Sequence, residues 1–355
     1  MELGLVERIV NAVLYEGYIL YPYRPSAVKN RQRFNFGALY PESYSLAQKG
    51  TDAWSMQTEC LVLGRARTAV DVRVRFLHLT ARDVSVPIAD SNFQTSDYRD
   101  EELRVVDSLD VDGQLFQTWQ EATERDVSAQ ELNLGELVAG PRRIAFDFPS
   151  KREAEPLRAA AGDVVGVIVR KQEPVEGAIE VAAERVINDL FKVTVRILNL
   201  SPFGDARQKS RDEALMKSLV STHTILGVHG GEFVSLLDTP DEFREAAASC
   251  KNVGTWPVLV GEGGERDCVL SSPIILYDYP QIAAESAGDL FDGTEIDEIL
   301  TLRIMTLTDE EKRAMRGVDD RARRILERTE SLPAEQMMKM HGAIRGLRPV
   351  EEDER

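Results

Sequence analysis

The chain has 355 residues, 60 of them acidic and 43 basic, which gives a formal net charge of −17. A surface of this charge repels phosphate backbones, so we expect no nucleic acid among its partners. The sequence contains no run of about 18 apolar residues, and we therefore expect no membrane insertion.

A helix and an aromatic, cationic segment are predicted in residues 1–55. Val6, Ile9, Val10 and Val13 have helical spacing and predict an amphipathic helix over 2–15. The Gly and Pro residues that follow cannot continue it. The next residues combine two tyrosines with four cations: Tyr21, Tyr23, Arg24, Lys29, Arg31 and Arg33. Such a set can bind an anion or an acidic partner surface. The alternative is a solvated loop whose cations pair with the chain's own carboxylates.

From about residue 56 the apolar residues repeat with a period of two. Val70, Val72, Val74 and Phe76 alternate with charged residues, which predicts a half-buried antiparallel strand. Further strands are predicted at 103–109, 113–118, 143–148 and 164–169. Short strands separated by turn signals are typical of a sandwich or barrel.

The segment 72–80, Val-Arg-Val-Arg-Phe-Leu-His-Leu-Thr, resembles the segment 193–201, Val-Thr-Val-Arg-Ile-Leu-Asn-Leu-Ser. Five of the nine positions are identical, and both segments end in the same pattern of leucine and polar residues. Any two alternating strands share some similarity, so the match has a simple alternative explanation. We interpret it as the trace of a duplication that produced two modules.

Residues beyond 205 are predicted to form helices and two hairpins. Ser210 with Glu213, and Thr308 with Glu311, are capping boxes that begin helices. A further helix is predicted over 239–248, and the hairpins pair 222–228 with 233–237 and 256–260 with 268–271. The C-terminal helices carry one apolar stripe, Met315, Val318, Ala322, Ile325 and Leu326, and a last helix from Pro333 is followed by a charged tail.

These elements predict a mainly β protein with helices (α+β), built as two tandem β-sandwich-like modules. The predicted units are 1–55 with the first helix and the cationic segment, 56–170 and 171–305 as the two β-modules, and 306–355 with the C-terminal helices. The three cysteines form no C-x-x-C pair, and the chain begins without a basic, apolar leader. Both features favour a cytoplasmic location.

Carboxylates gather between residues 278 and 298. Asp278, Asp289 and Asp292 offer the oxygen ligands that Mg²⁺ or Ca²⁺ prefers, although their spacing does not fit an EF-hand. His223 and His229, placed near a predicted hairpin turn, could add ligands. The alternatives are acidic residues that favour a helix N-terminus and satisfied polar histidines near a turn. We predict no cofactor from these residues, and binding of a divalent metal is an open alternative.

Four sequence segments resemble one known family. The segments 19–31, 254–261, 272–282 and 288–300 resemble a family encoded beside the nickel-iron hydrogenase genes of actinobacteria and some other soil bacteria. The family has no assigned activity, and no site residues can be carried over from it. The resemblance implies a role near hydrogenase assembly, maturation or regulation.

Three functional hypotheses follow. The first is an accessory or scaffold protein that binds a hydrogenase subunit or maturation factor. The second is a metal-dependent enzyme that uses the carboxylates of 278–298, and the third is a structural component of a larger assembly. Nucleophile elbows, Walker A sequences and dinucleotide-binding glycine motifs are missing from the sequence, so non-enzymatic binding is favoured. Formation of a homo-oligomer is an open alternative.

Overall fold

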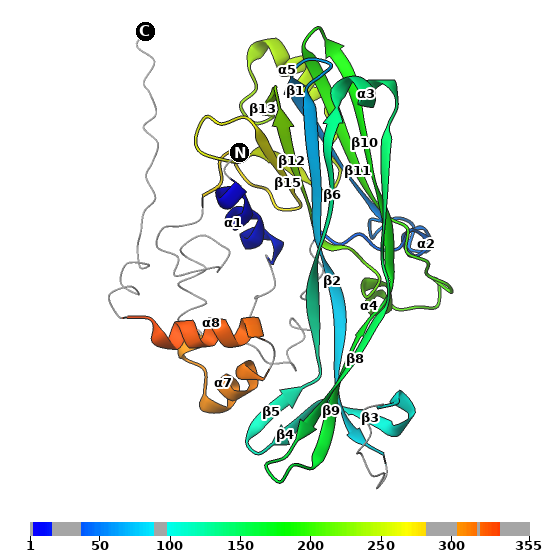
Figure 1. Ribbon diagram of the computed structural model, residues 1–355, viewed down its shortest axis with the longest axis vertical. Helices are drawn as coiled ribbons and strands as arrows, with labels where there is room; N and C mark the ends of the chain where they lie inside the picture. Colours follow the sequence, from blue (N-terminus) through cyan, green and yellow to red (C-terminus); the bar gives the residue numbers. More distant parts are fainter. Residues whose placement is uncertain (1–2, 16–36, 89–97, 282–303, 318–319, 334–355) are drawn as a thin grey trace.

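The structure is a computed structural model that describes residues 3–15, 37–88, 98–281, 304–317 and 320–333. It is an elongated molecule, and its longest strand runs along the long axis (Figure 1). Two large antiparallel sheets make up most of it, with short helices at their margins. The predicted fold class, mainly β with helices and a sandwich-like packing, is confirmed.

The first sheet has five strands in the order β13-β1-β11-β10-β7. Its central strand, β11, pairs with β1 on one side and with β10 on the other. The strands span β1 Ser55–Leu63, β7 Arg142–Phe148, β10 Val175–Ile187, β11 Leu190–Asn199 and β13 Glu232–Val234.

The second sheet has eight strands and is organised by β2, which is 19 residues long. Along one edge β2 pairs first with β12 and then with β9, and along the other it pairs with β6 and then β3. The first part of β2 thus lies between β12 and β6, and its last part lies between β9 and β3. The strands are β2 Ala69–Pro87, β3 Leu103–Val106, β6 Trp119–Asn133, β8 Lys151–Arg158, β9 Val164–Gln172, β12 Val220–His229, β14 Trp256–Leu259 and β15 Cys268–Ser272. A separate hairpin joins β4 Ser108–Val111 to β5 Gln114–Gln117.

The main core lies between the two sheets. Alternate residues of β2, Val72, Val74 and Phe76, pack with alternate residues of β11, Val193 and Val195, in one buried cluster. All five side chains are almost fully removed from water. Burial of this apolar face is the main driving force that holds the two sheets together.

Helices cover the margins of the sheets. The predicted first helix is confirmed as α1, whose buried face packs on Ile225 and Leu270 of the second sheet. The side chains of Glu7 and Asn11 also bind Arg75 on that face. The helices are α1 Leu3–Leu14, α2 Glu42–Ala47, α3 Leu134–Ala139, α4 Arg211–Leu215, α5 Arg244–Ala248, α7 Asp309–Arg316 and α8 Asp320–Ser331, with 3-10 turns at Asp100–Glu102 and Asp241–Phe243. None of the helices in these described ranges is long and apolar enough to cross a membrane.

The predicted boundary at residue 170 does not separate two sheets. Strand β1 from the first predicted module pairs with β11 from the second, and β12 from the second pairs with β2 from the first. Both ranges therefore contribute strands to both sheets. An alternating pattern specifies one buried face of a strand but not its hydrogen-bonded neighbours, which is why the pattern alone could not reveal this exchange.

The prediction that 222–228 and 233–237 form a hairpin is wrong. Strand β12 pairs with β2 and β15, whereas β13 pairs with β1 in the other sheet. The chain crosses from one sheet to the other at Gly230 and Gly231. Gly230 has a φ of +74°, and a Cβ on Gly231 would lie 2.6 Å from the Leu63 carbonyl oxygen. The two glycines thus permit a tight crossing rather than a hairpin turn.

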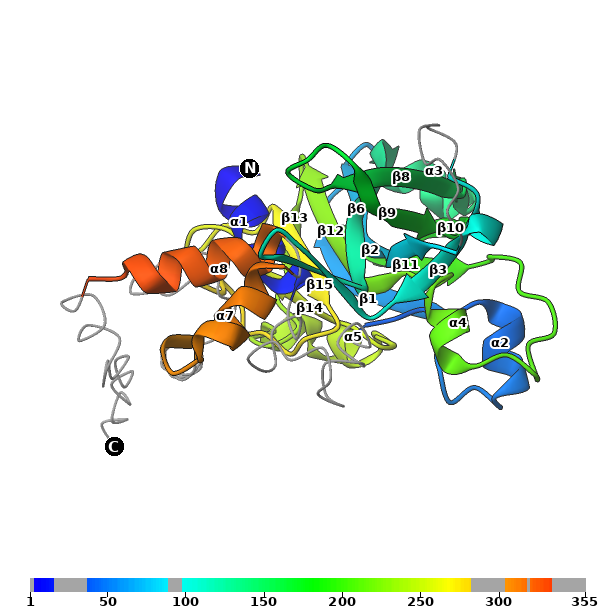
Figure 2. The same cartoon turned by 90° about the horizontal axis from the view of Figure 1, so that it is seen from below.

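Other predicted elements are confirmed or adjusted. Both capping boxes, at Ser210 and Thr308, are present, and β14 pairs with β15 as a hairpin. The predicted strand 103–109 is divided into β3 and the first strand of the β4–β5 hairpin, and the helix of 239–248 begins as a 3-10 turn. Met315 and three other buried stripe residues, from helices α7 and α8, pack with Trp119 in one cluster. Figure 2 shows these two helices side by side. Val318 and the predicted helix after Pro333 lie outside the described residues.

Candidate functional site

The cationic segment predicted to bind an anion or partner lies outside the described residues. This holds for all six of its members: Tyr21, Tyr23, Arg24, Lys29, Arg31 and Arg33. Its function stays a prediction. Asp289 and Asp292 of the predicted metal site also lie outside this range.

Asp278 has a structural role in the described part of the chain. Its Oδ1 accepts the backbone N–H of Leu259 at 2.8 Å, and its Oδ2 accepts the hydroxyl of Ser235. Ser235 in turn accepts the N–H groups of Leu237 and Asp238. The carboxylate therefore joins β14 to the turn after β13. Both of its oxygens accept hydrogen bonds within the fold.

The two predicted histidine ligands are separated. His223 is fully buried, and its Nδ1 lies 2.7 Å from the Ser221 carbonyl oxygen. His229 is exposed, and its Nε2 lies 2.8 Å from Asp71. Six residues of one strand place them about 20 Å apart at about 3.3 Å per residue. Among the described residues no three His, Cys, Asp or Glu side chains converge on a possible metal position.

The described parts of two segments that carry the family resemblance fold together at the edge of the second sheet. Strand β14 is the edge strand, and Trp256 at its start pairs with Ser272 of β15. The chain then turns back through 273–278 until the N–H of Tyr279 donates to the carbonyl oxygen of Leu259 at 2.8 Å. Both ends of this loop are thus fixed beside the same four-residue strand.

The side chains of this loop alternate between inside and outside. Ile274 and Leu276 pack inward against the cluster that α1 forms with β12 and β15. Ile275 and Tyr277 point outward and are 72% and 84% exposed, and Trp256 at the start of β14 is 45% exposed. We call Trp256, Ile275 and Tyr277 the edge surface. Exposed aromatic and aliphatic side chains on a fixed backbone are typical of protein-binding anchors.

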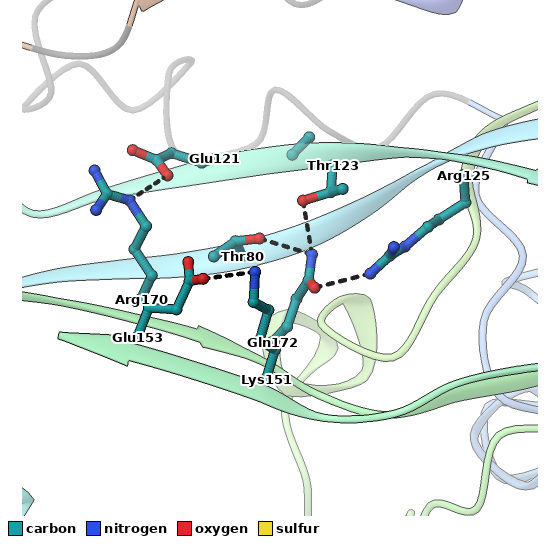
Figure 3. Close-up of a pocket in the computed structure, with 9 residues that line it drawn as sticks. Thr80, Glu121, Thr123, Arg125, Lys151, Glu153, Arg170 and Gln172 are labelled. Atoms are coloured by element: carbon teal, nitrogen blue, oxygen red, sulfur yellow. Dashed lines mark hydrogen bonds and ion pairs between the residues drawn. The ribbon is translucent and has the colours of Figure 1, made fainter.

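A polar pocket lies farther along the second sheet, where β6, β2, β9 and β8 run side by side (Figure 3). Its volume is about 290 Å³. Gln172 at the end of β9 is central to it, and we call it the Gln172 pocket. Its lining residues are Thr80, Glu121, Ala122, Thr123, Arg125, Lys151, Glu153, Arg170 and Gln172.

A hydrogen-bond network fixes the base of the Gln172 pocket. The Gln172 amide nitrogen donates to the hydroxyls of Thr80 and Thr123, both at 2.9 Å. Its amide oxygen accepts from Nη2 of Arg125 at 3.0 Å, as Figure 3 shows. The Nε of Arg125 also donates to Nδ1 of His78 at 3.4 Å. The orientation of the amide is therefore set by its neighbours.

His78 is neutral in this network. It is fully buried, and its burial lowers the imidazole pKa to about 4. Its Nε2 lies 2.8 Å from the carbonyl oxygen of Glu173 and must carry the hydrogen, which leaves Nδ1 free to accept from Arg125. The ring of Phe148 lies 4.7 Å from the guanidinium carbon of Arg125. Arg125 is thus held by uncharged groups.

The sequence contains a signal for this pocket. The inner face of β2 reads Val70, Val72, Val74, Phe76, His78, Thr80, Arg82, so that its apolar residues change to polar ones without a change of period. A buried face with a polar interruption indicates a site where polar groups are needed. The edge surface lies within the segments 254–261 and 272–282, on which the predicted resemblance depends.

The sequence matches none of the protein-family models with which it was compared, and no curated protein is similar to it. The resemblance to the hydrogenase-linked family therefore stays a prediction.

Proposed function

We propose that this protein is a cytoplasmic accessory or scaffold protein that acts by binding a protein partner through the edge surface. The proposal rests on one observation: Trp256, Ile275 and Tyr277 are exposed to solvent on an ordered backbone at one edge of the second sheet. Large apolar side chains exposed together are energetically unfavourable in water, and they mark interaction sites when a rigid backbone presents them.

The backbone beneath the edge surface is rigid for a clear reason. Asp278 follows Tyr277 directly and is bound to both Leu259 and Ser235. Tyr279 adds a hydrogen bond from its hydroxyl to the carbonyl oxygen of Glu265 at 2.8 Å. The backbone that carries the anchors therefore loses little conformational entropy when a partner binds, which favours affinity.

The partner expected from the resemblance is a hydrogenase subunit or a maturation factor. The edge surface supports a protein partner in general, and the resemblance supplies its identity. The metal-dependent alternative draws no support from the described residues, since Asp278 is used structurally and His223 and His229 are far apart.

The test is quantitative affinity capture from the native host with the full-length protein as bait. We expect enrichment of a hydrogenase subunit or maturation factor, and a loss of at least about tenfold with the double substitution Ile275→Ser and Tyr277→Ser. A loss of 1.4 kcal/mol already corresponds to tenfold in affinity, and one aromatic anchor often contributes more.

The matched control is Ile187→Ser, which removes an exposed aliphatic side chain of β10 in the other sheet. It should leave the enrichment unchanged. The proposal fails if no hydrogenase or maturation protein is enriched, or if the double variant captures the same proteins as the original chain.

A further inference from the structure

The inner face of β2 is polar between two apolar clusters. Up to Phe76 this face packs in the main core, and from Val84 it packs in a second cluster with Leu157 and Ile168. His78 and Thr80 lie between them and are 0% and 8% exposed. Buried polar groups destabilise a fold unless they are fully hydrogen-bonded. Apolar residues at positions 78 and 80 would avoid this cost.

Most charges in the Gln172 pocket are balanced. Lys151 pairs with Glu153 at 2.6 Å. Arg170 pairs with Glu121 at 2.9 Å and with Glu155 at 2.7 Å. Glu153 lies directly across from Arg170 in the pairing of β8 with β9, so the two ion-paired groups are neighbours, and neither offers an unbalanced charge.

Arg125 differs from these cations. Among the nine lining residues, all of which are described, it is the one cation that no carboxylate of the described chain pairs with. A guanidinium has five N–H donors, of which one is used by His78 and one by Gln172, so three remain. Partial burial lowers the pKa of Arg125, because the charge has lost part of its water.

Two hydroxyls add to this donor set. Thr80 and Thr123 each accept a hydrogen bond from the Gln172 amide, so each hydroxyl hydrogen is left to point elsewhere. Thr123 is exposed at the pocket surface. The pocket thus combines a planar guanidinium with hydroxyl donors around one amide.

We propose that the Gln172 pocket binds the carboxylate of a small organic acid, with Arg125 as its charged partner and Thr123 and Thr80 as hydroxyl donors. A guanidinium fork suits the two oxygens of a carboxylate. Arg125 is the one lining cation without a carboxylate partner in the described chain, so it balances one negative charge and not the two of a phosphate dianion. The pocket lies on different strands from the edge surface, and this inference does not depend on the proposed function.

The test is an NMR titration of the isotope-labelled full chain with propionate. Two further titrations use propionamide, which has the same shape without the charge, and inorganic phosphate. We expect saturable shifts with propionate and at least tenfold weaker binding of the other two compounds.

The decisive variant is Gln172→Glu. It places a carboxylate of the same shape beside Arg125, where the two threonine hydroxyls can turn to donate to it. The variant should fold, as checked by its unfolding temperature, and it should lose propionate binding at least tenfold. Gln114→Glu adds the same charge at an exposed position of β5 and should bind as the original chain does.

A milder variant, Thr123→Val, keeps the shape of an exposed side chain and should weaken propionate binding several-fold. The inference is overturned if propionate does not bind the original chain. It is also overturned if propionamide or phosphate binds as well as propionate, or if Gln172→Glu binds propionate unchanged.

Discussion

Strands β2 and β11 share a sequence pattern, but they use its polar end differently. In both strands alternate aliphatic or aromatic residues face the main core. His78 and Thr80 of β2 correspond in the pattern to Asn199, the last residue of β11, and Ser201, two residues farther on. All four side chains are buried, yet their partners are of different kinds.

At the end of β11 the polar side chains bind backbone. Asn199 donates to the carbonyl oxygens of Leu39 and Lys217 at 2.7 and 2.9 Å and accepts the N–H of Ser201 at 3.0 Å. In β2 the strand continues. His78 binds the backbone carbonyl of Glu173 but also the side chain of Arg125, and Thr80 binds the side chain of Gln172. Polar residues that end a strand complete the fold, whereas the same types within a continuous strand can form a site.

The largest predicted effect concerns the apolar part that both strands share. Phe76→Ala removes a fully buried ring that lies 5.9 Å from the ring of Phe146 and 5.8 Å from that of Phe148. The free energy of unfolding should fall by about 3 to 5 kcal/mol, measured by urea denaturation. Ile187→Ala at an exposed position should change it by less than about 0.5 kcal/mol. A Phe76→Ala effect as small as the control would mean that the two sheets are not held together by this core.

The second prediction uses the fact that His78 can be protonated and Asn199 cannot. Burial lowers the pKa of His78 to about 4, so between about pH 6.5 and pH 4 the unfolded chain binds a proton that the folded chain does not. The free energy of unfolding should therefore fall as the pH is lowered through this range, by up to about 3 kcal/mol for this imidazole.

His223 contributes to the same pH dependence, since burial lowers its pKa to about 4 as well. The variant His78→Asn makes β2 resemble β11 and should remove one of the two contributions. Urea denaturation at pH 7 and pH 4.5 measures the difference. An equal pH dependence in His78→Asn and the original chain would show that His78 is not buried in neutral form.

The third prediction concerns the structural role of Asn199. Asn199→Ala removes the side-chain partner of the Lys217 carbonyl oxygen and of the Ser201 N–H, whereas the Leu39 carbonyl oxygen keeps the N–H of Leu219. Unfolding free energy should fall by about 2 kcal/mol, because unpaired buried polar groups cost about 1 to 3 kcal/mol. Thermal or urea unfolding measures it. No measurable loss would mean that these bonds are replaceable and that the contrast with β2 does not hold.

The smallest effect is expected for Thr80→Val. The hydroxyl is lost, but the amide nitrogen of Gln172 keeps Thr123 as an acceptor, and the side-chain shape is conserved. The cost should stay below about 1 kcal/mol in the same urea assay. If Thr80→Val were as destabilising as Asn199→Ala, the polar residues of β2 would be structural in the same way as those of β11.

Much of the local structure follows from the sequence. The first helix, the alternating part of β2, both capping boxes and the β14–β15 hairpin depend on contacts within a few residues, and patterns of this kind are visible in a sequence. Strands such as β6 and β8 were not predicted, because their many polar residues hide the alternation. Their place in the sheet is decided by the neighbouring strand β2.

The pairing of strands and the Gln172 pocket could not be predicted, because both depend on distant parts of the chain. Arg125 and Gln172 are 47 residues apart, and only the shared neighbour β2 brings them together. Asp278 was predicted as a metal ligand from its type, whereas its bonds to Leu259 and Ser235 arise from the return of the loop along β14.

The proposed function is tested most directly by photo-cross-linking in the native host. A photoreactive amino acid replaces Tyr277, which is 84% exposed, and in a control strain it replaces Ile187. Position 277 should cross-link to a hydrogenase subunit or maturation factor, and position 187 should not. Absence of that product from position 277, or equal amounts from both positions, would contradict the assignment of the edge surface as the partner-binding site.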